Sequence, residues 1–254
     1  MIAIVFLIFA FGMLISAFLL EGGQMLGLVG LTAFMIVFGG TVGATGVSIR
    51  GTNLKNVGTL LKIAFLGRKS EAKKNAEFLE SISQKARRDG LLSLQDLRET
   101  GIDKFISDGI EFIVDGVDAE HLREILEIQA EQISARHKAN ISIFEAAGGY
   151  SPTMGIIGTV MGLVHVLSNL ENAENLGASI AVAFLATLYG IAFANLIYLP
   201  VANKLKALNE AEMNEKYMII EGLVAIAKME PHHVIQAKLS EFIENKKDRQ
   251  SLKK

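Results

Sequence analysis

Four long segments without any Asp, Glu, Lys or Arg constrain the fold of this chain more than any other feature. They occupy residues 2–20, 22–49, 146–170 and 175–203. Even the shortest, at roughly 1.5 Å rise per residue, forms a helix about 28 Å long, close to the roughly 30 Å hydrocarbon core of a bilayer. The sequence therefore predicts an all-α membrane protein with four transmembrane helices.

The composition agrees with this class. The chain is 50% hydrophobic and 20% charged, which is more apolar and less charged than most soluble domains of this size. A cleaved secretory signal is disfavoured, because no Lys or Arg precedes the first segment and Glu21 leads directly into the second.

The positive charges predict the orientation in the membrane. All 25 Lys and Arg lie within residues 50–138 or 204–254, whereas the short connections 21–24 and 171–174 carry only acidic charge. Because Lys and Arg concentrate in cytoplasmic loops, both large polar regions and both termini are predicted to be cytoplasmic.

Four regions follow from these limits. Residues 1–49 form a transmembrane hairpin, 50–145 a cytoplasmic helical domain, 146–203 a second transmembrane hairpin, and 204–254 cytoplasmic C-terminal helices. Apolar residues at helical spacing predict a long amphipathic helix that runs into the third span. Further helices are expected from Glu71 to Arg88, Leu94 to Thr100, Asp103 to Val114, and from Pro231 onward.

No motif indicates an enzyme. The absence of Cys excludes disulfides, thiolate metal sites and cysteine nucleophiles. There is no phosphate-binding loop, nucleophile elbow or metalloprotease helix motif. His232 and His233 are adjacent and point to different sides of a helix, so we expect no shared metal ion. We expect no cofactor and no nucleic-acid partner.

The third and fourth spans carry small and hydroxyl residues on helical faces, and neither contains a charged side chain. These residues are Gly155, Thr159 and Gly162 in the third span and Ala183, Thr187, Gly190 and Ala194 in the fourth. Because ion and proton relays usually display ionisable groups, the chain alone should not relay protons. The faces indicate either ordinary close helix packing or the wall of an ion pathway around a partner helix that supplies the charge.

Two prolines bracket this hairpin on its cytoplasmic side. Pro152 and Pro200 each remove a backbone hydrogen bond and can introduce a kink, and we treat both as candidate conformational residues. Alternatively, a proline near a helix start marks only the entry to a span.

Three sequence segments resemble a known family. GYSPTMGIIGTVMGLV (149–164) and AVAFLATLYGIAFAN (181–195) are similar to the third and fourth spans of the bacterial flagellar stator subunit MotA and its sodium-type relative PomA. ARRDGLLSL (86–94) resembles the basic stretch of the family's cytoplasmic domain. The similarity extends along essentially the whole chain, and it implies a multi-pass protein of the bacterial plasma (inner) membrane.

The resemblance implies an ion-conducting role in a rotary motor. Five A subunits would surround two single-span, peptidoglycan-anchored subunits of the MotB type, whose helices supply the ion-binding carboxylate. Thr159, Thr187, Ala183 and Gly190 would then line the ion pathway. Ion flow would turn the A ring and drive the rotor C-ring protein FliG.

The resemblance also implies a charged rotor interface. Arg87 and Arg88 match the family's basic residues, whereas Gln95 stands where the family has a glutamate. Asp96 or Glu99 is expected to replace that acid.

Two alternative functions and the identity of the transported ion stay open at this level. An ExbB- or TolQ-like energiser of outer-membrane processes also surrounds a charged partner helix, but it has three spans and a different loop order. A self-contained transporter would need intramembrane charges or broken helices at the bilayer midplane.

Thr159 favours sodium as the transported ion, whereas Ala186, where the sodium-type pattern has a second Thr, favours protons. We favour protons.

Overall fold

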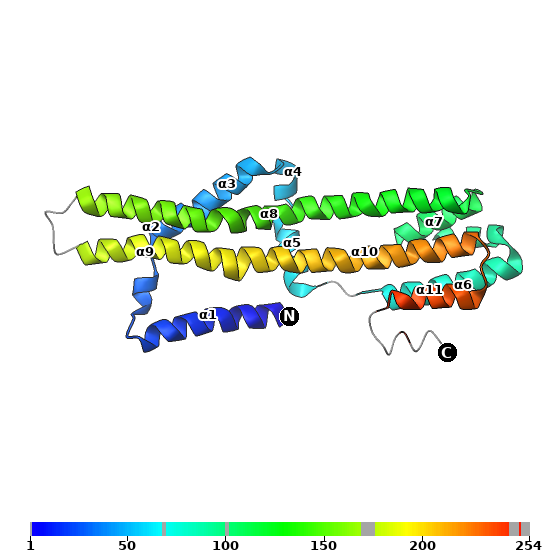
Figure 1. Cartoon of the computed structure of the whole chain (residues 1–254), viewed down its shortest axis with the longest axis horizontal. Coiled ribbons are helices and arrows are strands. Elements are labelled where there is room, and N and C mark those ends of the chain that lie inside the picture. Colours follow the sequence, from blue (N-terminus) through cyan, green and yellow to red (C-terminus); the bar gives the residue numbers. More distant parts are fainter. Residues whose placement is uncertain (1, 68–69, 100–101, 169–175, 244–248, 250–254) are drawn as a thin grey trace. The chain divides into compact units, whose positions relative to one another are not determined.

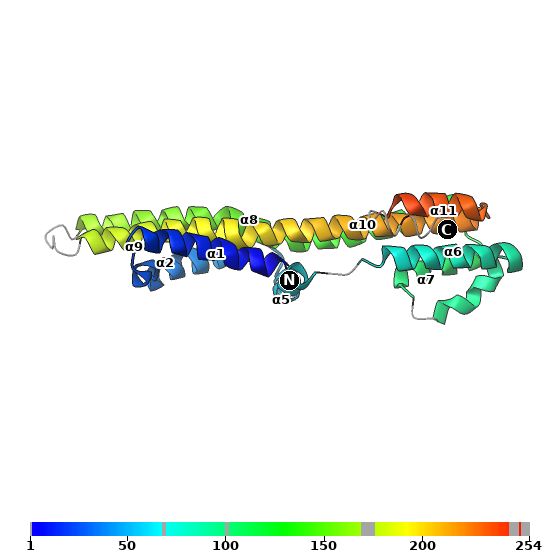
Figure 2. The same cartoon turned by 90° about the horizontal axis from the view of Figure 1, so that it is seen from below.

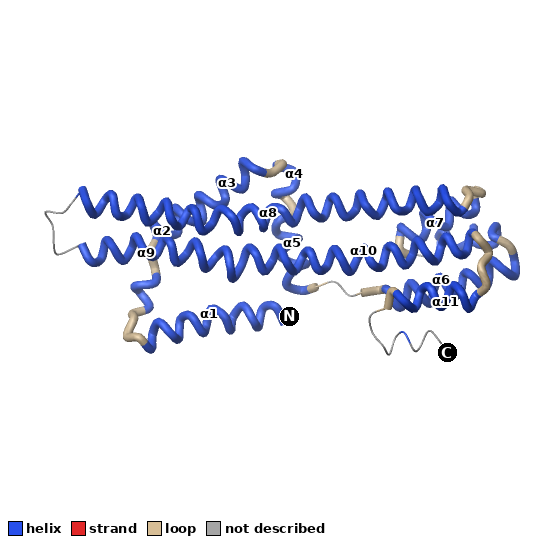
Figure 3. The backbone as a smooth tube through the Cα atoms, in the orientation of Figure 1, coloured by secondary structure: helices blue, strands red, loops and turns tan. Residues whose placement is uncertain are grey.

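A computed structural model describes residues 2–67, 70–99, 102–168, 176–243 and 249 (Figure 1). All regular secondary structure within these ranges is helical, which confirms the predicted all-α class (Figure 3). The helices form two compact units, one made of Met1–Gly67 and His137–Ala207 and the other of Arg68–Arg136 and Leu208–Lys254. These limits concern packing, whereas the predicted domain limits concern the membrane edge and stay predictions.

In the first unit, α1 (Ile2–Leu20) is apolar on every side, and none of its residues is buried within the chain. A helix that is hydrophobic all round is stable only inside a core or a membrane. The chain turns after it at Gly22, whose φ of 86° lies in the left-handed region that favours glycine. The helix is therefore suited to contact lipid or other membrane helices.

The second span begins with a break in the helix. A 3-10 turn, η1 (Met25–Leu28), is followed by extended backbone at Val29 and Gly30. The helix then runs without interruption through α2 (Leu31–Phe34), the π-turn η2 (Met35–Gly39) and α3 (Gly40–Ser48). The charge-free segment 22–49 thus contains a shorter regular helix than its length suggests. After extended Ile49, α4 (Gly51–Leu54) and α5 (Val57–Leu66) complete this part.

Two long helices carry the third and fourth spans. The 50-residue α8 (Ala119–Ser168) confirms the predicted amphipathic helix that runs into the third span. The fourth span is α9 (Leu176–Phe193), which continues through the π-turn η5 (Ala194–Tyr198) into α10 (Leu199–Ala227). The membrane portions of α8 and α9 lie side by side in both views (Figures 1 and 2).

Four of the described helical stretches are long and apolar enough to cross a membrane. They begin at Ile2, Met25, Ala119 and Leu176, so each of the four predicted charge-free segments contributes one of them. The protein is therefore a membrane protein with four spans.

The second unit contains the remaining helices. It comprises α6 (Ala72–Asp89), the 3-10 segment η3 (Leu91–Glu99), α7 (Lys104–Val114) and α11 (His232–Glu241), together with parts of α8 and α10. An ordinary helix was expected from Leu94 to Thr100, but the backbone adopts the tighter 3-10 form. Gly90 has a φ of 84°, and its carbonyl accepts bonds from both the N–H and the hydroxyl of Ser93, which starts this tight turn.

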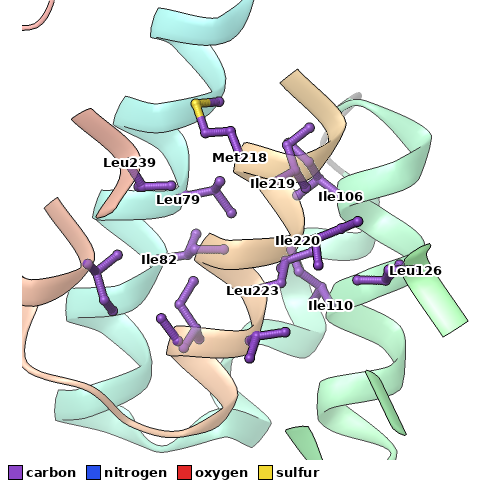
Figure 4. Packing of buried hydrophobic residues seen from close by; sticks show 14 of the residues in the cluster. Leu79, Ile82, Ile106, Ile110, Leu126, Met218, Ile219, Ile220, Leu223 and Leu239 are labelled. Carbon is purple, nitrogen blue, oxygen red and sulfur yellow. The ribbon is translucent and has the colours of Figure 1, made fainter. Parts of the chain in front are cut away.

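One hydrophobic cluster holds this unit together. Leu79 and Ile82 of α6, Ile106 and Ile110 of α7, Leu126 of α8 and Leu223 of α10 meet in it, and each is at most 2% exposed (Figure 4). Such burial of aliphatic side chains is the main favourable term in folding.

A partly buried ion pair stabilises the same unit. Asp103 caps α7 by accepting a 2.7 Å bond from the Phe105 N–H, and Lys216 Nζ of α10 lies 3.1 Å from its carboxylate. The Lys216 side chain is only 8% exposed, and its ammonium lies 4.6 Å from the Phe105 ring centroid. The carboxylate and the aromatic face together compensate the buried positive charge.

We expect Leu223→Ala to destabilise the second unit by about 2–5 kcal/mol, because it leaves a cavity in a fully packed core. Leu92→Ala is a matched control, since Leu92 is 72% exposed. The measurement is the urea midpoint of protease resistance of the full-length chain in detergent. Equal shifts for the two variants would contradict the assignment of this core.

Candidate functional site

The backbones of α8 and α9 approach each other closely along the small residues predicted for the third and fourth spans. A Cβ atom built on Gly155 would lie 2.8 Å from the Ala186 carbonyl oxygen. One built on Gly190 would lie 2.6 Å from the Ser151 carbonyl oxygen. Both neighbours are backbone atoms, which cannot move aside as a flexible side chain does. Glycine is therefore required at both positions by packing alone.

Polar bonds cross the same interface. The fully buried Ser151 hydroxyl donates to the Gly190 carbonyl at 2.9 Å. Such interhelical bonds stabilise helix association in a bilayer, where water is not available to compete.

The two predicted threonines meet at this interface. Thr159 Oγ1 lies 2.5 Å from Thr187 Oγ1, 2.9 Å from the Ala183 carbonyl oxygen and 3.2 Å from the Gly155 carbonyl oxygen. Because a hydroxyl carries one proton, both groups are satisfied when Thr159 donates to Ala183 and accepts from Thr187. This arrangement leaves the lone pairs of Thr187 available to a further donor or cation.

An exposed apolar face surrounds this hydroxyl pair. Ile156 and Val160 of α8 and Phe184, Leu188 and Ile191 of α9 are each 46–60% exposed and recur at helical spacing beside the two threonines. No Asp, Glu, Lys or Arg occurs within residues 146–168 or 176–203. The face is suited to contact another apolar helix, and it contributes only uncharged oxygen ligands.

On another side of the hairpin, α8, α9 and α2 enclose a cavity of about 450 Å³. Thr32, His165 and Ser179 are among its lining residues, as is Ala183. Neither Thr159 nor Thr187 lines it, so the hydroxyl pair and this cavity are separate features.

The other predicted residues of this region are also placed. Ala183 and Gly190 are buried between α8 and α9, so helix packing accounts for their small size. Pro152 lies inside α8, which continues through it. Pro200 lies in the first turn of α10 directly after the π-turn η5, in which the Leu199 N–H donates to Ala194 O, five residues back. Their roles in ion passage or in conformational change stay predictions.

A tyrosine that the sequence reasoning did not select holds the break in the second span. The Tyr189 hydroxyl of α9 donates to the Leu28 carbonyl at 2.5 Å and accepts from the Gly30 N–H at 3.1 Å. It therefore satisfies two backbone groups that extended backbone leaves free, a requirement in lipid. In the sequence, only the break itself had a signal, the pair Gly27 and Gly30 in an otherwise helical apolar segment.

The predicted rotor residues lie in the second unit. Arg87 and Arg88 lie in the last turn of α6, and both are exposed, as is Asp96 on η3. Glu99 ends η3, but its side chain lies outside the described part of the chain. The turn at Gly90 connects the end of α6 to η3. We call the exposed charged residues on its two sides the Arg87–Asp96 patch (Arg87, Arg88, Asp89 and Asp96).

Asp89 is the member of this patch that the sequence reasoning missed. Arg88 Nε and Nη2 each donate to its carboxylate at 2.9 Å, and this contact lowers the pKa of Asp89 below its ordinary value. Arg87 has no ion-pair partner among the described residues. Arg87 is therefore the arginine of the pair that keeps its full charge available to a partner.

We expect Gly155→Ala to weaken the α8–α9 contact by about 1–3 kcal/mol, because the new methyl group overlaps backbone. Gly149→Ala is the matched control in the same helix, since nothing lies within 4 Å of a Cβ built there. The thermal midpoint of the detergent-solubilised chain measures the difference. An unchanged midpoint for Gly155→Ala would contradict the close packing.

Comparison with known proteins shows which family the chain resembles. The profile of the MotA/TolQ/ExbB proton channel family matches residues 97–218, and that of the motility protein A N-terminal region matches residues 4–90. Motility protein A of Bacillus subtilis is 34% identical over 93% of this chain and 88% of its own length. Chemotaxis protein PomA of Vibrio alginolyticus is 30% identical over 93% of this chain and 92% of its own.

Solved structures agree. A chain from the structure of C. jejuni MotAB superimposes with a TM-score of 0.91 at 30% identity, covering 97% of both chains. A chain of the flagellar MotAB stator complex from Bacillus subtilis gives 0.89 at 32% identity, covering 99% of both. Identities of 30–34% over nearly the full length, four membrane spans and the same fold show that this chain belongs to the MotA/PomA family of flagellar motor stator ion-channel subunits.

Proposed function

We propose that the chain forms an ion pathway together with a MotB-type single-span subunit, and that ion flow through it produces torque on the flagellar rotor. The observation that carries this proposal is the exposed apolar face of α8 and α9, which has the Thr159–Thr187 pair at its centre and no charged residue. Such a face offers packing surface and oxygen ligands, but it needs a carboxylate from another helix. The solved relatives are titled MotAB, which supports a B-type partner.

In this proposal each group of residues has a separate role. The partner's carboxylate binds and releases the ion, while the Thr187 oxygen provides a polar contact halfway along an apolar wall. The tight α8–α9 backbone contact keeps the wall rigid while the partner helix changes its position against it. Pro152 and Pro200 are the proposed positions at which these helices adjust.

The proposed setting is the bacterial plasma membrane, with both termini cytoplasmic, and the proposed ratio is five copies of this chain to two B subunits anchored to peptidoglycan. The positive-inside distribution of Lys and Arg supports the orientation. The Arg87–Asp96 patch is proposed to contact FliG, because exposed charge of both signs suits an electrostatic interface.

An ExbB- or TolQ-like role is the second candidate, since the matched channel family includes those proteins. The match of residues 4–90 to the motility protein A N-terminal region favours the flagellar role, because that part contains the first hairpin.

We expect the chain reconstituted alone to give background proton and sodium flux, because the described parts of its spans hold no ionisable relay. Co-reconstitution with a B-type subunit should open a pathway, and replacing the partner's intramembrane Asp with Asn should close it. The measurement is ion flux into liposomes under an imposed gradient. Robust flux from the chain alone would favour a self-contained transporter.

We expect Arg87→Glu with Arg88→Glu to impair swimming while assembly in the membrane stays intact. Arg87→Glu alone should have the larger single effect, because Arg88 is already paired with Asp89. A compensating charge reversal on FliG should restore part of the speed. Lys73→Glu, on the same helix but near its start, serves as the control for charge alone. Unchanged speed in the double variant would remove the patch from the rotor interface.

We expect swimming speed to be independent of external sodium at constant pH, because Thr159 is already bonded to a carbonyl and Ala186 supplies no oxygen. Thr159→Ala should then keep this independence. Thr153→Ala is the control, since that exposed hydroxyl bonds to its own helix. A steep sodium dependence that disappears in Thr159→Ala would instead identify sodium as the ion.

A further inference from the structure

A second cavity in the membrane-spanning unit has no part in the proposed ion pathway. It has a volume of about 490 Å³, within the range of sites that bind small molecules and cofactors. Its walls come from α2, η2, α3, α4, α5, α8, α9 and η5 and are almost entirely apolar, with Phe34, Phe38, Leu61, Phe144 and Ile197 among the lining residues.

Two threonines on this cavity wall have an unusual environment. Thr41 and Thr45 are only 1% and 4% exposed, and neither hydroxyl has a hydrogen-bond partner among the described residues. A threonine in a membrane helix usually bonds the carbonyl four residues earlier, so two successive unbonded hydroxyls call for an external partner. The partner must bring a polar atom into an otherwise apolar space.

The lining follows the second span from Phe34 to Thr45, about 16 Å at roughly 1.5 Å rise per residue, and it also includes Leu54 and Leu61 of the next two helices. An acyl chain is long enough to follow this wall, and a glycerolipid places an ester carbonyl, a hydrogen-bond acceptor, at the head of that chain. The ester can therefore accept from the Thr45 and Thr41 hydroxyls while the chain extends toward Phe34.

The charged residues next to the lining of α4 and α5 indicate which headgroup follows. Arg50, Lys55 and Lys62 are exposed beside the lining residues of α4 and α5. No Asp or Glu occurs anywhere between residues 22 and 70. Exposed basic side chains at the membrane surface attract anionic headgroups.

We infer that this cavity binds one acyl chain of an anionic phospholipid, with the ester group at Thr41 and Thr45 and the phosphate beside Arg50, Lys55 and Lys62. The inference needs only the membrane-spanning unit, so it stands or falls independently of the ion pathway.

The test uses tryptophan fluorescence, because the chain contains no Trp. Phe38→Trp places a reporter on the cavity wall, and Phe9→Trp, at a position 63% exposed on α1, reports bulk lipid. The full-length chain is reconstituted in vesicles with increasing fractions of acyl-brominated phosphatidylglycerol or phosphatidylcholine. For the cavity reporter, phosphatidylglycerol should reach half-maximal quenching at about a tenfold lower fraction than phosphatidylcholine. For Phe9→Trp the two lipids should behave alike.

Thr41→Val with Thr45→Val, in the Phe38→Trp background, should abolish the preference, since valine keeps the shape but removes the hydroxyl. Thr45→Val alone should reduce it, and Thr153→Val should leave it unchanged, because that hydroxyl bonds to its own helix. Helical content by circular dichroism verifies folding of each variant. Identical curves for the two lipids at Phe38→Trp would overturn the inference. If neither lipid quenches the Phe38→Trp reporter, the inference is also overturned, and the cavity is assigned to a neighbouring copy of the chain.

Discussion

The direct contact between the backbones of α8 and α9 is the constraint on which the membrane part of this protein depends. In lipid there is no hydrophobic gain from bringing two apolar helices together, so close packing and interhelical bonds must provide the stability. Gly155 and Gly190 allow the approach, and Ser151 adds a bond across it. The same approach brings the hydroxyls of Thr159 and Thr187 within bonding distance, so the packing and the candidate ion-pathway chemistry have one origin.

The second unit is stabilised by a different balance. There an ordinary aliphatic core is combined with a cap, an ammonium and an aromatic ring at Asp103, Lys216 and Phe105. The charges proposed for the rotor are exposed, in the last turn of α6 and on η3. Exposed charges on a well-packed helix can be changed with little cost to folding, so charge reversals here should affect a binding partner more than stability.

Sequence reasoning worked where one local property decides the structure. Charge-free length predicted the spans, and helical spacing predicted the course of α8 into the third span. It failed where a distant contact decides. Nothing near Leu28 indicates that Tyr189 will bond its carbonyl, and nothing local reveals the unbonded hydroxyls of Thr41 and Thr45. The 3-10 form of η3 was not predicted, because Gly90 and Ser93 close a tight turn within a pattern that is typical of an α-helix.

The two π-turns bear on how sequence length can vary in this family. A π-turn accommodates one residue more than the α-turn it replaces, so removing one residue within Met35–Gly39 would leave buried Ala33, Thr41 and Thr45 facing the same way. A deletion in a regular turn would rotate everything beyond it by about 100°. The second π-turn, Ala194–Tyr198, lies directly before Pro200, which has no N–H to continue the helical bonds. A one-residue deletion within either π-turn is therefore expected to keep the faces of the helix beyond it, whereas a deletion in the α-turns between them is not.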